Sequence, residues 1–225
     1  MRHLLLLSLA LAACGDSSNK TVDAAPADMA IDARPVLPLT PQAYCDTIGT
    51  ACTGANAQYA SSMACLAAAA AFTPGAASTE TSGDTLGCRI YHAQNAMISN
   101  DPTTHCPHAG PIGAKVDAAT GVCSASPCAA FCALDNKLCG TDAAPVTGVT
   151  NRYTTNAACL TACANFDKTV QFNSSTTTGP TFACRVFHLE NVAIYTAMAM
   201  PNLVNAHCGH TLAVGTDPTI LGPCK

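Results

Sequence analysis

Residues 88–92 read Cys-Arg-Ile-Tyr-His, and residues 184–188 read Cys-Arg-Val-Phe-His. A second pair of matching stretches follows: His-Cys-Pro-His at 105–108 and His-Cys-Gly-His at 207–210. Matches at many spaced positions indicate a tandem duplication, in which one structural unit is written twice. We therefore predict two similar domains in tandem.

The matches set the boundaries of two predicted segments, a Cys-rich helical repeat at 40–123 and a second repeat at 124–225. The residues before them are predicted to be a signal peptide at 1–13 and a disordered tether at 14–39. The tether holds Asp, Ala and Pro with no apolar period, and such a composition buries too little surface to fold.

Each predicted repeat has the pattern of three short helices followed by a loop. Thr40-Pro41 and Ser126-Pro127 are typical of an N-cap followed by Pro at the first helical position. The other predicted helix starts are Ser61 or Ser62, Thr85, Thr154 or Thr155, and Thr181. The Gly- and Pro-rich residues 107–111 predict a loop. We predict an all-α fold class: two tandem, disulfide-stapled small helical domains.

The composition indicates an oxidising compartment. Fifteen of the 225 residues are Cys, and that many thiols would be a hazard where they stay reduced. Aromatic residues make up only 5% of the chain, and an Ala-rich core buries little area, so disulfides are needed for stability. A net charge of −4 excludes a basic nucleic-acid-binding surface.

Fourteen Cys remain beside Cys14, an even number that predicts seven disulfides in an exported chain. Cys128 and Cys163 have no counterpart in the first repeat, so they most simply pair with each other. Since Cys128 and Cys163 each have a Cys four residues away on the same helix, antiparallel packing also pairs those two. The resulting predictions are Cys128–Cys163, Cys132–Cys159 and, by alignment, Cys45–Cys65. The other pairs are guesses among open alternatives: Cys52–Cys88, Cys106–Cys123, Cys139–Cys184 and Cys208–Cys224.

The N-terminus has the pattern of a secretory signal. A short basic start precedes an apolar run at residues 4–11, too short to span a membrane. Leu11-Ala12-Ala13-Cys14 resembles the bacterial lipobox, which implies a lipid at Cys14 and a place in the bacterial cell envelope. Gly15 after the lipidated Cys favours the outer membrane, with the body either periplasmic or surface-exposed. An ordinary signal peptide is the alternative.

The order of Cys-Arg-x-aromatic-His, His-Cys-x-His and a closing Cys resembles uncharacterised Cys-rich tandem-repeat lipoproteins of myxobacteria and their relatives. The resemblance covers most of residues 40–225. It implies no known activity and no site.

All six His residues beyond the leader fall at matched positions. They are His92, His105 and His108, then His188, His207 and His210. If Cys88 and Cys106 are both bridged to the core, His92 converges with the loop that carries His105 and His108. Three neutral imidazoles are a common ligand set for Zn²⁺ or Cu²⁺. The alternative is a structural role, in which each His bonds a loop carbonyl.

Arg89 and Arg185 are matched too. Such an Arg either caps carbonyls, pairs with a nearby Asp, or binds an acidic partner. Glu80 and Glu190 are the only Glu residues and do not match each other, and no phosphate loop, nucleophile elbow or zinc-protease motif is present.

The chain is therefore predicted not to be an enzyme. The expected function is a lipid-anchored, disulfide-stabilised extracytoplasmic binding or structural module. Its expected partners are the membrane, through the N-terminal lipid, and a protein or envelope ligand. The alternative is a metal-binding lipoprotein with a His triad in each repeat, which would hold Zn or Cu; no other cofactor is expected.

Overall fold

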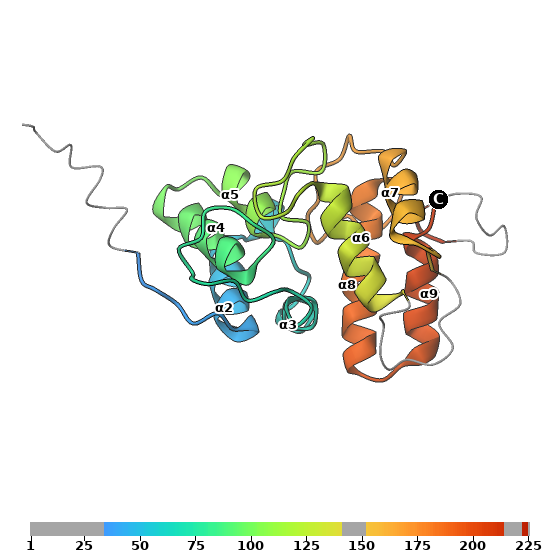
Figure 1. Ribbon diagram of the computed structural model, residues 1–225, viewed down its shortest axis with the longest axis horizontal. Helices are drawn as coiled ribbons and strands as arrows, with labels where there is room; N and C mark the ends of the chain where they lie inside the picture. Colours follow the sequence, from blue (N-terminus) through green and yellow to red (C-terminus); the bar gives the residue numbers. More distant parts are fainter. Residues whose placement is uncertain (1–33, 141–151, 214–221, 225) are drawn as a thin grey trace, which may run out of the picture. The chain divides into compact units, whose positions relative to one another are not determined.

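Figure 1 shows the computed structural model of the chain, which describes residues 34–140, 152–213 and 222–224. Within these residues the fold is helical and has no strand, only the isolated bridges Thr73–Thr85 and Asp167–Thr181. The predicted all-α, disulfide-stabilised fold is confirmed. The signal peptide, the lipidation site Cys14 and the tether up to residue 33 lie outside the described residues.

Residues 35–225 form one compact unit, and the helices divide between a first half, residues 34–125, and a second half, residues 126–224. The first half carries α2 (Pro41–Ala51), the 3-10 helix η1 (Gly54–Asn56), α3 (Ser62–Ala69), α4 (Leu86–Ile98) and α5 (Pro102–Ala109). The second half carries α6 (Pro127–Leu138), α7 (Asn156–Ala164), α8 (Phe182–Ala197) and α9 (Pro201–Thr211). None of these helices combines the length and apolar character that crossing a membrane requires.

Hydroxyl side chains begin six of the helices. Each accepts a hydrogen bond from the backbone N–H three residues later, and the capping residues are Thr40, Ser61, Thr85, Ser126, Thr155 and Thr181. A cap of this kind satisfies a backbone donor that has no partner inside the helix, which contributes about 1 kcal/mol. The predicted helix starts are confirmed, with Ser61 and Thr155 as the caps where two candidates were open.

A fourth helix in each half corrects the predicted loop. The Asp101 carboxylate caps α5, Pro102 occupies its first turn and Pro107 lies inside it. Pro107 removes one backbone hydrogen bond and so favours a loop in the sequence. Tertiary contacts override this preference, because Cys106 is bridged to Cys52 on α2 and α5 packs along α4. In Figure 1, α8 and α9 likewise run side by side.

Seven disulfides tie the helices together. The structure forms the predicted Cys45–Cys65, Cys132–Cys159 and Cys128–Cys163 bonds. In place of the guessed Cys52–Cys88, Cys106–Cys123, Cys139–Cys184 and Cys208–Cys224 bonds, it forms Cys52–Cys106, Cys88–Cys123, Cys139–Cys208 and Cys184–Cys224. The guess placed Cys106 in a loop. On α5 this residue instead faces the end of α2, which leaves Cys88 to pair with Cys123.

Buried side chains form two clusters. The first cluster lies within the first half and is built on α2 and α4, with Tyr44 and Ile90 fully buried. The second cluster is centred on the second half but includes Ala68, Ile112 and Val116 from the first half. Because Ala side chains are short, α3 lies close to α8. The two halves therefore share apolar surface.

Candidate metal centres

The first candidate centre lies between α4 and α5, which pack side by side (Figure 1). His92 projects from α4, and His105 and His108 lie three residues apart on α5, so both reach the same face. The Nδ1 atoms of His92 and His105 are 3.0 Å apart, and the rings of His92 and His108 have centroids 5.0 Å apart. Each of the three residues offers a nitrogen, and these nitrogens lie within 4.8 Å of one another. The structure thus brings the predicted triad together.

A backbone carbonyl fixes the orientation of His92. Its Nε2 atom lies 3.2 Å from the carbonyl oxygen of Thr81. Since a carbonyl only accepts hydrogen bonds, Nε2 carries the proton and the Nδ1 lone pair faces the other two rings. Metal-binding His residues normally donate the N–H of the nitrogen that faces away from the metal to a carbonyl or carboxylate in this way.

The second candidate centre, between α8 and α9, repeats this arrangement. Nδ1 of His188 lies 2.8 Å from Nδ1 of His207 and 3.3 Å from Nδ1 of His210. Nε2 of His188 lies 3.2 Å from the carbonyl oxygen of Thr177, the same distance as in the first centre. Both predicted triads therefore have one buried His on the longer helix and two half-buried His on the shorter one.

Burial keeps three of the six imidazoles neutral, those of His108, His188 and His207. It lowers the pKa of His108 to about 4, with smaller contributions from His92 and His105. It also lowers the pKa of His188 and of His207 to about 4. A neutral imidazole is the form that binds a metal, so these side chains need not lose a proton at pH 7.

The nitrogen positions fit a tetrahedral ion. Zn²⁺ binds His nitrogen at 2.0–2.1 Å, which places tetrahedral ligand nitrogens about 3.4 Å apart. The Nδ1–Nδ1 distances of 3.0 Å in the first centre and of 2.8 and 3.3 Å in the second come close to this spacing. In addition, Nδ1 of His108 is buried and has no hydrogen-bond partner. An unpaired buried nitrogen is costly unless something binds it.

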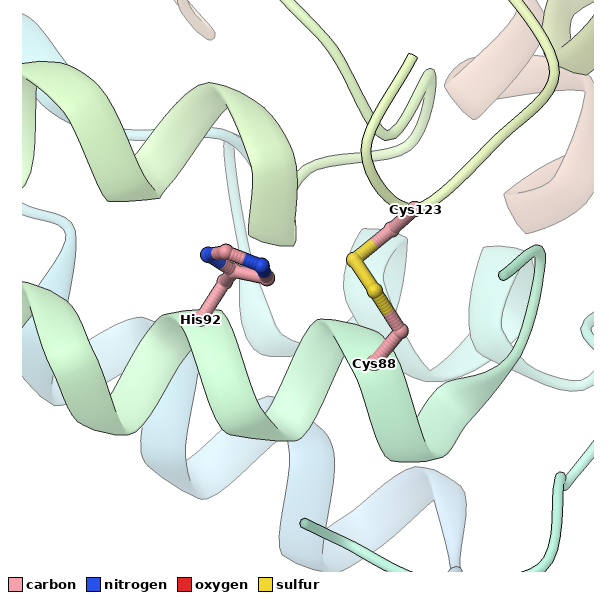
Figure 2. Close-up of side chains that lie close together, drawn as sticks. All are labelled: Cys88, His92 and Cys123. Carbon is pink, nitrogen blue, oxygen red and sulfur yellow. A yellow bond between two sulfur atoms is a disulfide. The ribbon is translucent and has the colours of Figure 1, made fainter. Parts of the chain in front are cut away.

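A disulfide lies next to each buried His. Figure 2 shows His92 one helical turn from the Cys88–Cys123 bond. A nitrogen of His92 and both sulfurs lie within 4.8 Å of one another, and the second half has the same arrangement around His188. The thiolate, not disulfide sulfur, is the metal ligand that Cys provides. The disulfides therefore border each centre on one side, and three imidazoles remain as its candidate ligands.

The sequence identified the six His residues but not the carbonyls that orient two of them. Thr81 and Thr177 lie eleven residues before His92 and His188. Both stretches are irregular, and any residue type provides a backbone carbonyl. The equal spacing in the two halves was the available signal.

Comparisons with known proteins give partial matches. A model described as the BfoA family C-terminal domain matches residues 27–126. The protein "Aurasperone B biosynthesis cluster protein A" of Aspergillus niger is 35% identical over 108 residues, which are 48% of this chain and 32% of that protein. The protein "Bifonsecin B biosynthesis cluster protein A" of Aspergillus brasiliensis is 41% identical over 69 residues, 31% of this chain and 23% of that protein. No solved structure matches.

These relatives correct one prediction. The chain spans no more than about a third of the length of the curated relatives it matches. All of these relatives are proteins of Aspergillus biosynthesis clusters, so the assignment to bacterial, myxobacterial Cys-rich lipoproteins is wrong.

Proposed function

We propose that this chain is an exported, disulfide-stabilised metal-binding protein with one Zn²⁺ or Cu²⁺ site in each His triad. The observation that carries the proposal is the pair of Nδ1 clusters, each with its buried His held by a backbone carbonyl. The role is that of a binding module rather than an enzyme.

Two further features support this function. The same ligand set recurs in both halves on corresponding helices, as expected if a tandem duplication copied a working site. Seven disulfides support export to an oxidising compartment, where His is a more dependable ligand than free Cys.

Metal titration of protein purified without a His-tag tests the proposal. Calorimetry with Zn²⁺ and with Cu²⁺ should give two ions per chain. His105→Ala should remove the first site and His207→Ala the second, so that each variant binds one ion and the double variant binds none.

Met97→Ala provides the matched control, because Met97 lies on α4 with 45% of its surface exposed and outside the triad. It should bind two ions. Thermal unfolding of each apo variant checks that binding is lost without loss of the fold. Wild-type protein that takes up neither ion overturns the proposal, and so does uptake that the triad substitutions leave unchanged.

A further inference from the structure

Arg89 and Arg185 occupy matched positions near the starts of α4 and α8, and both are buried. The Arg89 guanidinium lies 4.1 Å from the centre of the Phe72 ring, and the Arg185 guanidinium lies 4.2 Å from that of Phe166. Each Nη1 also donates to the carbonyl oxygen of a matched residue, Thr85 for Arg89 and Thr181 for Arg185. The remaining partners of the two arginines differ.

Arg89 has every partner it needs within its own half. Its Nη1 lies 2.9 Å from the carboxylate of Asp84. Its Nε and Nη2 donate to the carbonyl oxygens of Gly110 and Pro111. The positive charge of Arg89 is therefore neutralised where it is buried.

The surface around Arg89 is also covered. We call it the first groove; it is formed by Ala71, Phe72, Thr73, Asp84, Arg89 and Pro111. Helix α6 of the second half lies over it, with Ala130 and Leu134 buried in the contact and Lys137 donating to the carbonyl of Ala71. A cavity of only about 30 Å³ remains.

The matching surface around Arg185 has a larger cavity. This second groove is formed by Asn165, Phe166, Asp167, Pro180, Arg185 and Ala213, residues that correspond one by one to those of the first groove. Its cavity volume is about 510 Å³. Within the described ranges, no helix takes the place that α6 has on the first groove.

Arg185 also lacks the counterion that Arg89 has. Pro180 stands at the position of Asp84, and no carboxylate of the described residues forms an ion pair with Arg185. Its Nε has no hydrogen-bond partner. Asp167, at the rim, accepts hydrogen bonds from Thr169 instead. A buried, unpaired charge is costly, so the second groove is suited to an acidic partner.

The helix that matches α6 is α2. It presents Ala43 and Thr47 where α6 buries Ala130 and Leu134. The exposed Asp46 of α2 stands at the position of Ala133, which lines the first groove beside Arg89 and Asp84. A copy of α2 seated as α6 is seated would therefore bring a carboxylate to Arg185.

We propose that the second groove receives α2 of another copy of this chain, with Asp46 of that copy paired to Arg185. The carboxylate that the first half supplies from Asp84 is then supplied by the neighbouring molecule. The contact joins two different surfaces, so repetition gives rings or open chains of molecules rather than a symmetric dimer. Thr47 in place of Leu134 makes this contact more polar than the contact between the halves. Because the contact is intermolecular, association depends on protein concentration, and because it includes an ion pair, association weakens with salt.

Sedimentation velocity of the full chain over a wide concentration range tests the proposal. The average mass should rise with concentration. Asp46→Lys should raise the dissociation constant at least about tenfold by placing like charges together. Pro180→Asp should do the same, because it gives Arg185 a carboxylate in its own half and repels Asp46. Both positions are exposed, so both variants should fold, which thermal unfolding checks.

Thr53→Lys is the control, since it places the same lysine side chain at an exposed position just beyond α2 and outside the groove contact. It should associate as the wild type does. A photo-crosslinking residue at position 50 of α2 should link to residues 162–167 of a different, isotopically labelled copy. A chain that stays monomeric at every concentration overturns the proposal. So does association that Asp46→Lys and Pro180→Asp leave unchanged, or that Thr53→Lys weakens equally.

Discussion

The two halves have the same helices, yet one carries a buried carboxylic acid where the other is apolar. Ile48 on α2 corresponds to Asp135 on α6, and both are at most 2% exposed. In the first half the residue after His108 is Ala109, and its carbonyl accepts a hydrogen bond from Tyr44. In the second half the residue after His210 is Thr211, and its hydroxyl lies 2.8 Å from Asp135. Asp135 and Thr211 thus form a polar pair where the first half has the apolar side chains of Ile48 and Ala109, and the helices of the two halves are the same.

The geometry indicates which form of Asp135 the fold prefers. The Thr211 hydroxyl is also 2.8 Å from the carbonyl oxygen of Cys208, and it has a single proton to donate. If it donates to Cys208, the contact with Asp135 requires a proton on Asp135. Burial acts in the same direction and raises the pKa of Asp135 to about 7. A buried acid of this kind is stable when neutral and costly when ionised.

The halves differ in a second respect, the number of bonds that hold their first two helices. Cys45–Cys65 alone joins α2 to α3, whereas Cys128–Cys163 and Cys132–Cys159 both join α6 to α7. Two bonds that close nearly the same loop are redundant, because the second restricts the unfolded chain little further. The first half should therefore be the more sensitive to loss of a disulfide.

The largest effect is expected for the double change Cys45→Ala and Cys65→Ala. It should lower the free energy of unfolding by about 3 kcal/mol, since the bond closes a loop of sequence separation 20 that no parallel bond closes. Cys132→Ala with Cys159→Ala should cost about 1 kcal/mol or less, because Cys128–Cys163 remains. Denaturant unfolding measures both, and equal losses would contradict the idea of redundancy.

A smaller effect is expected for Asp135→Asn, and it should depend on pH. The folded-state pKa of Asp135 lies above its unfolded value of 3.8, so the folded protein binds more protons between about pH 4 and pH 7. Stability from this group is therefore present at low pH and is lost as the pH rises through that range. At pH 8 the Asn variant should be about 2 kcal/mol more stable than wild type, and at pH 4 it should show no such gain.

Thermal unfolding between pH 4 and pH 8 measures this difference. Asp117→Asn, at an exposed position, is the control and should bring no comparable gain. If Asp135→Asn shifts the stability equally at both pH values, ionisation is not the cause.

The smallest effect is expected at the two arginines. Asp84→Asn should cost about 0.5–1 kcal/mol, because the Asp84 side chain is 48% exposed and Arg89 keeps its bonds to two backbone carbonyls. Pro180→Asp should stabilise the protein by a similar amount at concentrations where it is monomeric. Chemical unfolding at low and high salt provides the measurement, and insensitivity to salt would contradict an electrostatic origin.

Local signals in the sequence were sufficient for most of the fold. Hydroxyl caps marked the helix starts correctly because a cap depends on residues within one turn. The extra pair Cys128 and Cys163 identified three disulfides, since four-residue spacing on a helix restricts which Cys can meet. The helices α5 and α9 were missed. Pro107 opposes α5 locally, and only the packing against α4 and the bond to Cys52 outweigh that preference; α9 has no side-chain cap at its start.

The candidate centres also have one part that local sequence signals predict and another that depends on packing. The matched positions of six His residues were enough to predict two triads, and the structure places each triad together. Three other features depend on which loop or helix passes nearby. They are the carbonyls that orient His92 and His188, the hydrogen bond between Asp135 and Thr211, and the difference between the two grooves. No residue type in the sequence encodes that.

The pattern of disulfides has a mechanical consequence. All seven bonds join residues within one half, and none crosses from one half to the other. Each half is thus cross-linked internally, and the only covalent connection between the halves is the backbone near residue 125. Apolar contacts, such as those of Ala68 and Val116, also hold the halves together. When the chain is pulled from its ends, the two halves should separate from each other before either half unfolds. A single proteolytic cut in the link would leave two intact bodies that only their shared apolar surface keeps in register.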